Sequence, residues 1–520
     1  MIQAAVCDSA GGFEAVNARI LERLRAWLVD ASRELLQQCS ESLGALHRDT
    51  LAAMMGRAEL LFYLGKSGEA EKLFREALRL RRDTLGDVHE DTLTSMMRLA
   101  ETLWELGELT AAEQLFRSAE RGRLELLGAT HRDTLKATSN VAACAAQQLY
   151  LHGKLGDEAV QLLREVLLSQ RTELGAAHQD TCGSMLHLGI ALSWLGEAEQ
   201  LVEAEALMHD ALRGMQESHG EAHLFTLECS TGLALLKQRQ GRHMEAEPLL
   251  RHALRCQLEL LGLEHPTTLK SMMRLADLLF DVQAAAAGLL SDEHAAEAEQ
   301  LYREALRGRR EALGDAHEDT LLVMYNLAAL LRFDESKHSE REQLYREALR
   351  LRRGALGDAH ADTLESMMSL ADLLFDEQAA EAGLLSDEHA AEAEQLYREA
   401  LRGRREALGD AHEDTLEVMY NLAALLRFDE SKHSEREQLY REALRLRRGA
   451  LGDAHADTLE SMMSLADLLF DEQATEAGLL SGEHAAEAEQ LYREALRGRR
   501  EALGDAHEDT LLVMPHWPVH

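Results

Sequence analysis

One short pattern returns along the whole chain: glycine preceded by Leu or His, two residues, a histidine, two residues and a threonine. The histidines of this pattern are His47, His89, His131, His178, His223, His265, His317, His360, His412, His455 and His507. The intervals between them are 42, 42, 47, 45, 42, 52, 43, 52, 43 and 52 residues. A near-constant period of this length is the signature of a solenoid, in which each unit is buried only by its neighbours. Such a repeat suits a long surface that holds other proteins better than chemistry at one buried site.

Each unit is predicted to be a helical hairpin. The first helix of the second unit carries apolar residues at helical spacing and ends at Gly107; the second helix runs to Gly128. We expect Gly128 in a left-handed position after the helix, and Asp87 with Glu90 as a capping box for the first helix. The arginine pairs near the ends of the second helices are expected to offset the helix dipole. The repeated histidine is expected to pack at each junction and to help cap the next helix.

The small and large positions of this hairpin match the tetratricopeptide consensus: Met96, Leu99, Ala100, Leu103, Ala112, Phe116 and Ala119. The 42-residue period and the segments 297–306 and 392–401 are more specific, and they resemble the longer repeats of kinesin light chains and nephrocystin-3-like proteins. The resemblance covers roughly residues 44 to 514. It implies an all-α fold, a right-handed α-solenoid of about ten tetratricopeptide hairpins. The coiled coil that precedes the repeats of kinesin light chains has no counterpart here, because no sustained heptads occur before His47.

Composition excludes several classes of partner. The net charge is −37, from 92 acidic against 55 basic residues, which argues against nucleic acid and against anionic membranes. The six cysteines contain no C-x-x-C pair, and no apolar run approaches about 20 residues. We therefore expect a cytoplasmic protein with reduced thiols, without a membrane span, whose partners are other proteins.

Three segments are expected: an orphan helix and leader at 1–43, the repeat array at 44–514, and an irregular tail at 515–520. Residues 315–409 and 410–504 are near-identical copies that differ only at Leu322/Glu417, Ala380/Thr475 and Asp387/Gly482. In the 52-residue hairpins, we expect the first helix to run to about Ala382, break at Gly383 and restart with Ser386 as N-cap. Because the final half-unit has no polar cap, the chain is interpreted either as a piece of a longer protein or as a degenerate array.

No residues support an enzyme, a cofactor or a metal site. Gly65-Lys66-Ser67 resembles the end of a P-loop, but Leu60 stands where that motif needs glycine. The repeated histidine beside Asp and Glu occurs at one structural position in every unit, which indicates a structural role, and H-E-x-x-H is missing.

A peptide-binding surface is expected on the first helices, which line the concave face in tetratricopeptide arrays. The residue before each Leu-Ala pair points into that face, and in related arrays an Asn there holds a peptide backbone. Asn140, Asn326 and Asn421 match by type and place, and an amide both donates and accepts. The alternative is that each is a solvated asparagine on the surface of a helix. Met and Tyr, among them Tyr325 and Tyr420, precede this position; they are expected either to contact peptides or to pack between helices.

The predicted groove changes charge along the chain. Its first half carries basic residues, namely Arg98, Lys136, Lys270 and Arg274, and its second half carries acidic residues, namely Glu365, Asp372, Glu417, Glu460 and Asp467. We expect the second half to prefer basic or apolar segments. The predicted function is a non-catalytic scaffold that binds extended peptides or partner helices in the groove. The alternatives are a kinesin light chain-like cargo adaptor and a regulatory fragment of a larger signalling protein or enzyme.

Overall fold

The computed structural model describes residues 10–151, 157–280, 291–375, 386–470 and 482–504. These residues contain α-helices and three short 3₁₀ turns, without any β-strand, and they divide into two compact units at Gly314/Asp315. The helices of the first unit are α2 (Ala10–Leu43), α3 (Arg48–Tyr63), α4 (Ser67–Leu85), α5 (Glu90–Glu105), α6 (Leu109–Leu127), α7 (Arg132–Leu151), α8 (Asp157–Glu173), α9 (Gln179–Leu195), α10 (Ala198–His219), α11 (Leu224–Arg239), α12 (His243–Leu261), α13 (Pro266–Leu279) and α15 (Asp292–Leu313).

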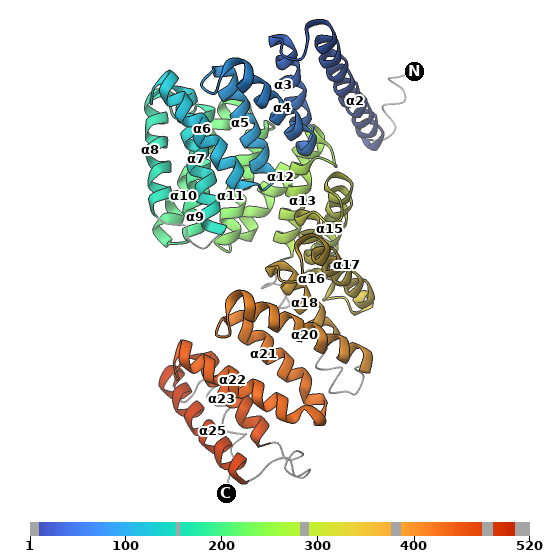
Figure 1. Cartoon of the computed structure of the whole chain (residues 1–520), viewed down its shortest axis with the longest axis vertical. Helices are drawn as coiled ribbons and strands as arrows, with labels where there is room; N and C mark the ends of the chain where they lie inside the picture. The colour runs from blue at the N-terminus through green and yellow to red at the C-terminus, as the bar shows by residue number, and fades with distance from the viewer. Residues whose placement is uncertain (1–9, 152–156, 281–290, 376–385, 471–481, 505–520) are drawn as a thin grey trace. The chain divides into compact units, whose positions relative to one another are not determined.

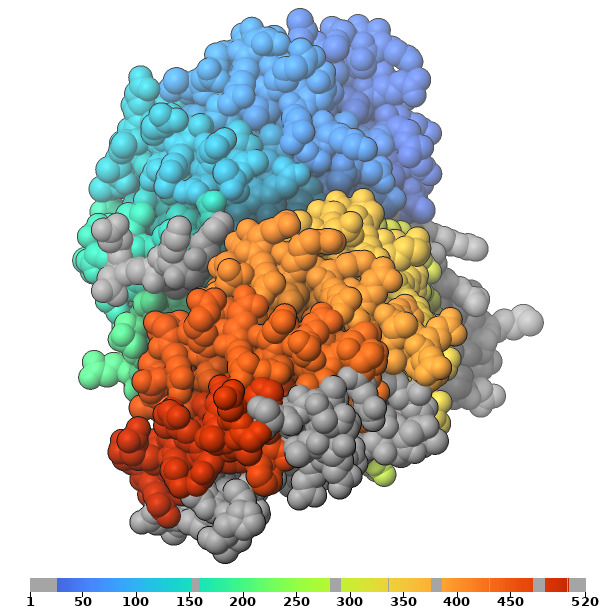
Figure 2. All heavy atoms as spheres, turned by 60° about the horizontal axis from the view of Figure 1, so that its bottom comes forward, coloured from blue at the N-terminus to red at the C-terminus, as the bar shows by residue number. Residues whose placement is uncertain are grey.

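The second unit continues the same alternation. Its elements are α16 (Glu318–Leu331), η1 (Glu335–Lys337), α17 (His338–Leu356), α18 (Ala361–Leu374), α20 (Asp387–Leu408), α21 (Glu413–Leu425), η2 (Leu426–Phe428), η3 (Glu430–Lys432), α22 (His433–Leu451), α23 (Ala456–Leu469) and α25 (Gly482–Leu503). Within each unit, nearly every helix packs against the helices before and after it in the chain, as Figure 1 shows. In Figure 2 the atoms of the second unit, gold to red, form a continuous surface where they are in view. The all-α solenoid of hairpins is therefore confirmed for the described residues.

Each junction between hairpins is built from the glycine and histidine of the repeated pattern. All eleven pattern glycines have φ of 82–91°, and at Gly86 this is combined with a ψ of 170°. That combination differs from the left-handed helical conformation that we expected, and it is essentially restricted to glycine. A side chain at this position would strain the backbone, which explains why the glycine recurs in every unit.

The junction histidine is the N-cap of the following helix. In ten junctions the Nδ1 atom accepts the backbone N–H two residues later at 3.2–3.3 Å. The expected help of the histidine in capping is confirmed, whereas the expected capping box of Asp87 and Glu90 is wrong because His89 holds the cap position. His47 and most of its equivalents keep close to half of their side chain exposed, so they cap more than they pack. His507 lies outside the described residues.

An arginine near the end of the second helix ties successive hairpins together. The Arg81 guanidinium is buried and donates to the backbone oxygen of Asp91 at 2.8 Å and to Ser95 Oγ at 2.9 Å. The same bond to a backbone oxygen ten residues later is made by Arg123, Arg352, Arg404 and Arg447. The arginine pair was expected to offset the helix dipole. The structure adds hydrogen bonds from one arginine to the first helix of the next hairpin, because a guanidinium offers several donors in one plane.

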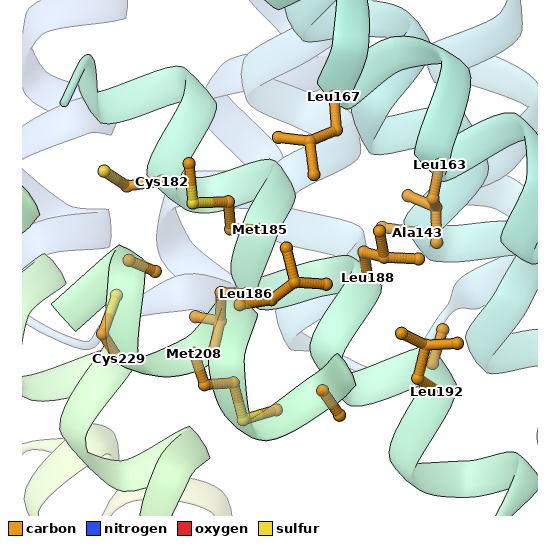
Figure 3. Packing of buried hydrophobic residues seen from close by; sticks show 14 of the residues in the cluster. Ala143, Leu163, Leu167, Cys182, Met185, Leu186, Leu188, Leu192, Met208 and Cys229 are labelled. Atoms are coloured by element: carbon orange, nitrogen blue, oxygen red, sulfur yellow. The ribbon is translucent and has the colours of Figure 1, made fainter. Parts of the chain in front are cut away.

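Buried apolar residues pack in clusters between neighbouring helices. Figure 3 shows Met185, Leu188 and Leu192 of α9 packed among side chains of neighbouring helices, including Leu163 of α8 and Met208 of α10. These residues are at most 1% exposed. They repeat at helical spacing, so each hairpin depends on the next one to cover its apolar face.

The 52-residue hairpins differ from the expectation in one respect. Helix α18 ends at Leu374, and Phe375 leaves the helical conformation with φ −97° and ψ 83°. The predicted continuation to Ala382 is therefore wrong, and the predicted break at Gly383 lies outside the described residues. The predicted restart is confirmed, since Ser386 is the N-cap of α20 and its Oγ accepts the His389 N–H at 3.1 Å.

Candidate peptide-binding surface

The predicted peptide-contact residues lie on the first helices, in two rows one helical turn apart. We define the inner row as the residue before each Leu-Ala pair or the equivalent pair of its unit: Gly56, Arg98, Asn140, His187, Gly232, Arg274, Asn326, Ser369, Asn421 and Ser464. The charge row lies four residues earlier: Ala52, Thr94, Lys136, Gly183, Glu228, Lys270, Leu322, Glu365, Glu417 and Glu460. Residues at i and i+4 share one face of a helix, so the two rows form one strip in each unit.

The basic residues at the start of the strip are already paired. Arg98 donates to Glu59 at 3.2 Å and to Glu101 at 2.9 Å, and the Lys136 ammonium lies 3.6 Å from Glu101. Burial acts to lower the pKa of Arg98, but Glu101 and Glu59 outweigh it, so the pKa is raised. Two of the four basic residues predicted in the first half of the groove, Arg98 and Lys136, thus face glutamates of their own chain, and their charge is largely balanced.

The other end of the strip in the first unit holds a denser set of charges. Burial lowers the pKa of Arg274, against the opposing fields of Glu228 and Asp277. Burial raises the pKa of Glu228, although Lys270 and Arg274 act to lower it, and burial also raises the pKa of Glu105. Glu105 and Glu228 nevertheless keep solvent-exposed surface. Protein therefore surrounds these carboxylates closely without covering them.

Between these charges lie a histidine and an asparagine. The His187 ring lies 5.7 Å from the Trp104 ring, and its Nδ1 atom is buried without a hydrogen-bond partner among the described residues. Burial lowers the pKa of His187 to about 4. Asn140 keeps only 8% of its surface exposed. Because the side chain of Asn140 is nearly buried, a bound peptide backbone would contact only the exposed edge of its amide.

Four methionines next to the inner row belong to the core, and Met463 is half-buried. Met55, Met97, Met273 and Met368 are 3–6% exposed, so they pack between helices, which was the alternative to peptide contact. Tyr325 and Tyr420 are half-buried, and each makes an edge contact with a tyrosine of the following helix, Tyr345 or Tyr440. Their remaining exposed surface is what they offer to a ligand.

In the second unit, Asn421 joins a hydrogen-bonded group that the sequence did not reveal. Its Nδ2 donates to Asp372 Oδ1 at 3.2 Å, and the buried Tyr397 hydroxyl donates to the same oxygen at 2.6 Å. Burial raises the pKa of Asp372, and Glu417 raises it further. The same tyrosine-to-aspartate bond recurs in Tyr302–Asp277 and Tyr492–Asp467. The amide of Asn421 is thus partly used within the protein, and Asn326, which is half-buried, also has interactions of its own.

The charge row of the second unit is exposed and lacks basic residues. Leu322, Glu365, Glu417 and Glu460 all have exposed side chains. Helices α16, α18, α21 and α23 contain no Lys or Arg. Glu417 lies 3.5 Å from Arg404 of α20, whereas Glu365 and Glu460 form no ion pair with the residues that the structure describes. This face therefore presents acidic groups whose charge is only weakly balanced.

Within the described ranges, no three His, Cys, Asp or Glu side chains come together as a metal-binding group. None of the described helices combines the length and the apolar character needed to cross a membrane.

Family models match most of the array. One tetratricopeptide repeat model matches residues 49–125 and 229–287; a second matches 285–319, 320–362, 384–414, 415–457 and 483–509. Together they cover more than half of the chain. The chain belongs to the tetratricopeptide repeat proteins. This repeat is generally a protein-interaction fold and is typically non-catalytic. No curated protein matches the chain.

Solved structures show distant similarities. A Podosopora anserina protein, provisionally named a kinesin light chain with nearly identical repeats, is 22% identical, with a TM-score of 0.35 over 43% of this chain and 99% of that one. BtubC (BKLC) from P. vanneervenii is 19% identical, with a TM-score of 0.37 over 51% and 93% of the two chains. RapI without ligand is 14% identical, with a TM-score of 0.47 over 79% and 98%. Similarities this distant carry no conclusion about what this tetratricopeptide protein binds.

Proposed function

We propose that this protein is a non-catalytic scaffold that holds extended peptide segments on its first helices, and that its second unit selects basic segments. The observation that carries the proposal is the three exposed glutamates of the charge row in the second unit, Glu365, Glu417 and Glu460. Their helices contain no Lys or Arg. An acidic strip attracts basic ligands and rejects acidic ones, which gives specificity more than raw affinity.

The neighbouring polar groups support a peptide as the ligand. Tyr325, Tyr420 and Asn421 lie beside the charge row and offer hydroxyl and amide groups that can bond to a peptide backbone. In the first unit, Asn140 and Arg274 complete the proposed contacts, with the paired Arg98 and Lys136 at the margin of the site. The ligand of the first unit is therefore expected to depend less on charge than the ligand of the second.

The proposal is tested with three fluorescent linear peptides that differ only in having Lys, Glu or Gln at alternate positions. We expect the full chain to bind the Lys peptide preferentially and to lose that preference at high salt. The triple variant Glu365→Gln, Glu417→Gln, Glu460→Gln is expected to weaken binding of the Lys peptide by roughly five- to thirtyfold, at about 0.3–0.7 kcal/mol per exposed pair.

The matched control is Glu311→Gln, Glu406→Gln, Glu501→Gln, which removes the same charge from exposed glutamates on second helices. This control is expected to leave binding nearly unchanged. Leu322→Glu, which copies the natural difference from Glu417, is expected to strengthen binding of the Lys peptide. Equal affinities for the three peptides, or equal losses in the two triple variants, would overturn the proposal.

A further inference from the structure

Two segments of the first unit that are about 200 residues apart meet directly. The His265 Nε2 atom lies 3.1 Å from the backbone oxygen of Tyr63, at the turn between α3 and α4. The ring of Pro266 lies against Gly65 so closely that a Cβ added there would be 2.2 Å from Pro266 Cδ. We call Tyr63, Gly65, His265 and Pro266 the clasp. Figure 1 shows the turn between α3 and α4 near α13.

The hydrogen bonds of His265 fix its protonation state. Its Nδ1 accepts the Thr267 N–H at 3.2 Å to cap α13, so this nitrogen carries a lone pair. The Nε2 atom must then carry the hydrogen and donate a hydrogen bond to the backbone oxygen of Tyr63. Among the ten junction histidines that the structure describes, His265 is the one whose Nε2 also reaches a distant hairpin.

Charges behind the clasp link the same parts of the chain. Lys270, one turn into α13, acts on Glu105 of α5 and on Glu228 of α11, and lowers the pKa of both against the larger effect of burial. Helix α13 therefore interacts with the first hairpin through the clasp and with the second through Glu105. The last of the six hairpins from α3 to α15 thus returns to the first two through α13.

We propose that the first six hairpins form a ring held by the clasp, and that the clasp controls access to the inner row of this unit. Because lateral access is blocked, a partner reaches Asn140, His187 and Arg274 as an extended segment with a free chain end. A segment between two folded domains reaches them only when the clasp opens. This inference rests on the proposed function for its ligand, but the closure itself is tested without one.

Two substitutions open the clasp by different means. Gly65→Ala places a methyl group into Pro266, and its control Gly107→Ala has the same backbone strain, with φ of 83° against 76°, and nothing within 4 Å. His265→Asn keeps a capping oxygen but is too short to reach Tyr63. His89→Asn is its control, because the Nε2 atom of His89 makes no hydrogen bond to another hairpin among the described residues. Losing one hydrogen bond is expected to raise the open population about fivefold.

Closure is measured by the distance between spin labels at Glu69 and Glu264, two exposed positions beside the clasp, in the full chain with Cys7 and Cys39 changed to Ser. We expect one short, narrow distribution in the parent and in both controls. Gly65→Ala and His265→Asn are expected to add a longer, broader component. A broad distribution already present in the parent would overturn the ring.

Access is measured at a cysteine placed in the inner row, Arg274→Cys, with two probes of equal mass. A linear polyethylene glycol with a terminal maleimide models a free chain end, and a two-armed one with maleimide at its branch point models an internal segment. We expect the branched probe to react more slowly in the parent and to gain about fivefold in His265→Asn and more in Gly65→Ala. Equal rates for both probes in the parent would refute control of access, whatever the peptides bind.

Discussion

Two glycines in helices of the first unit are expected to respond in opposite directions to the same substitution. Gly56 of α3 is exposed, and a Cβ added there meets nothing within 4 Å. Gly122 of α6 is buried, and a Cβ there would lie 2.5 Å from Leu93 Cδ2 and 3.3 Å from Leu93 Cδ1. Leu93 is itself only 2% exposed, so it has little room to move.

The two sites share one favourable effect and differ in one unfavourable effect. Alanine is better than glycine inside a helix by about 1 kcal/mol, because glycine loses more backbone freedom. At Gly56 that gain stands alone, so Gly56→Ala is expected to stabilise its hairpin by about 0.5–1 kcal/mol. At Gly122 overpacking costs about 1–3 kcal/mol, so the net effect is a loss of up to about 2 kcal/mol.

The assay is hydrogen–deuterium exchange of the full chain, followed on peptides from α3 to α6, because a repeat array opens locally rather than all at once. This part of the sequence is not duplicated, so its peptides are assigned without ambiguity. Gly56→Ala is expected to slow exchange in α3 and α4, and Gly122→Ala to speed it in α5 and α6.

A double variant checks the cause. Leu93→Ala alone is expected to cost about 2–5 kcal/mol through the cavity that it leaves. In that background the added methyl of Gly122→Ala has room, so the second substitution is expected to become favourable. If Gly122→Ala alone slows exchange as Gly56→Ala does, the contact with Leu93 is not limiting, and the packing argument is refuted.

Three further outcomes are expected. His131→Ala should speed exchange at the start of α7 by an amount equivalent to about 1 kcal/mol, whereas His131→Asn, which still caps, should not; equal effects would show that the Nδ1 bond is unimportant. Burial lowers the pKa of His187 from 6.5 to about 4, so this residue resists protonation in the folded state. Its contribution to the free energy of unfolding is fully present above pH 6.5 and falls by about 3 kcal/mol as the pH decreases to 4. His187→Gln should therefore make the urea midpoint depend less on pH on the acid side than it does in the parent. Asp372, with its pKa raised, favours the folded state most below its unfolded pKa and loses that advantage as pH rises; Asp372→Asn should therefore raise the urea midpoint of the second unit at pH 7 more than at pH 4.

The period and the apolar spacing predicted the fold correctly because both are local properties of the chain. The spacing of Met96, Leu99 and Leu103 defines a helix face, and the glycines mark where helices end. The N-cap was predicted at the wrong residue because Asp87 and Glu90 imitate a capping box two positions early. The structure shows that an imidazole takes this role at His89.

The site was harder to predict because its chemistry depends on neighbours in other hairpins. Arg98 looked like a free cation, but Glu59, 39 residues earlier, lies on the adjacent first helix and pairs with it. Asn421 matched a peptide-binding position, yet its amide donates a hydrogen bond to Asp372 of the preceding 52-residue hairpin. The clasp joins Tyr63 to His265 across 202 residues, and no local pattern marks either end.

The junction pattern has a consequence for the length of the chain. Residues 315–409 and 410–504 begin with the same Asp-Ala-His-Glu-Asp-Thr-Leu sequence, and each follows Leu-Gly. Loss of one copy would bring Asp410 directly after Gly314. The glycine turn, the histidine N-cap and the hydrogen bonds of the buried arginine would then form at the new junction as they did at the removed one. Recombination between the copies can therefore shorten or lengthen the molecule by 95 residues without breaking a single junction, and the residue left at Leu322 or Glu417 would decide how many acidic groups the shortened array keeps.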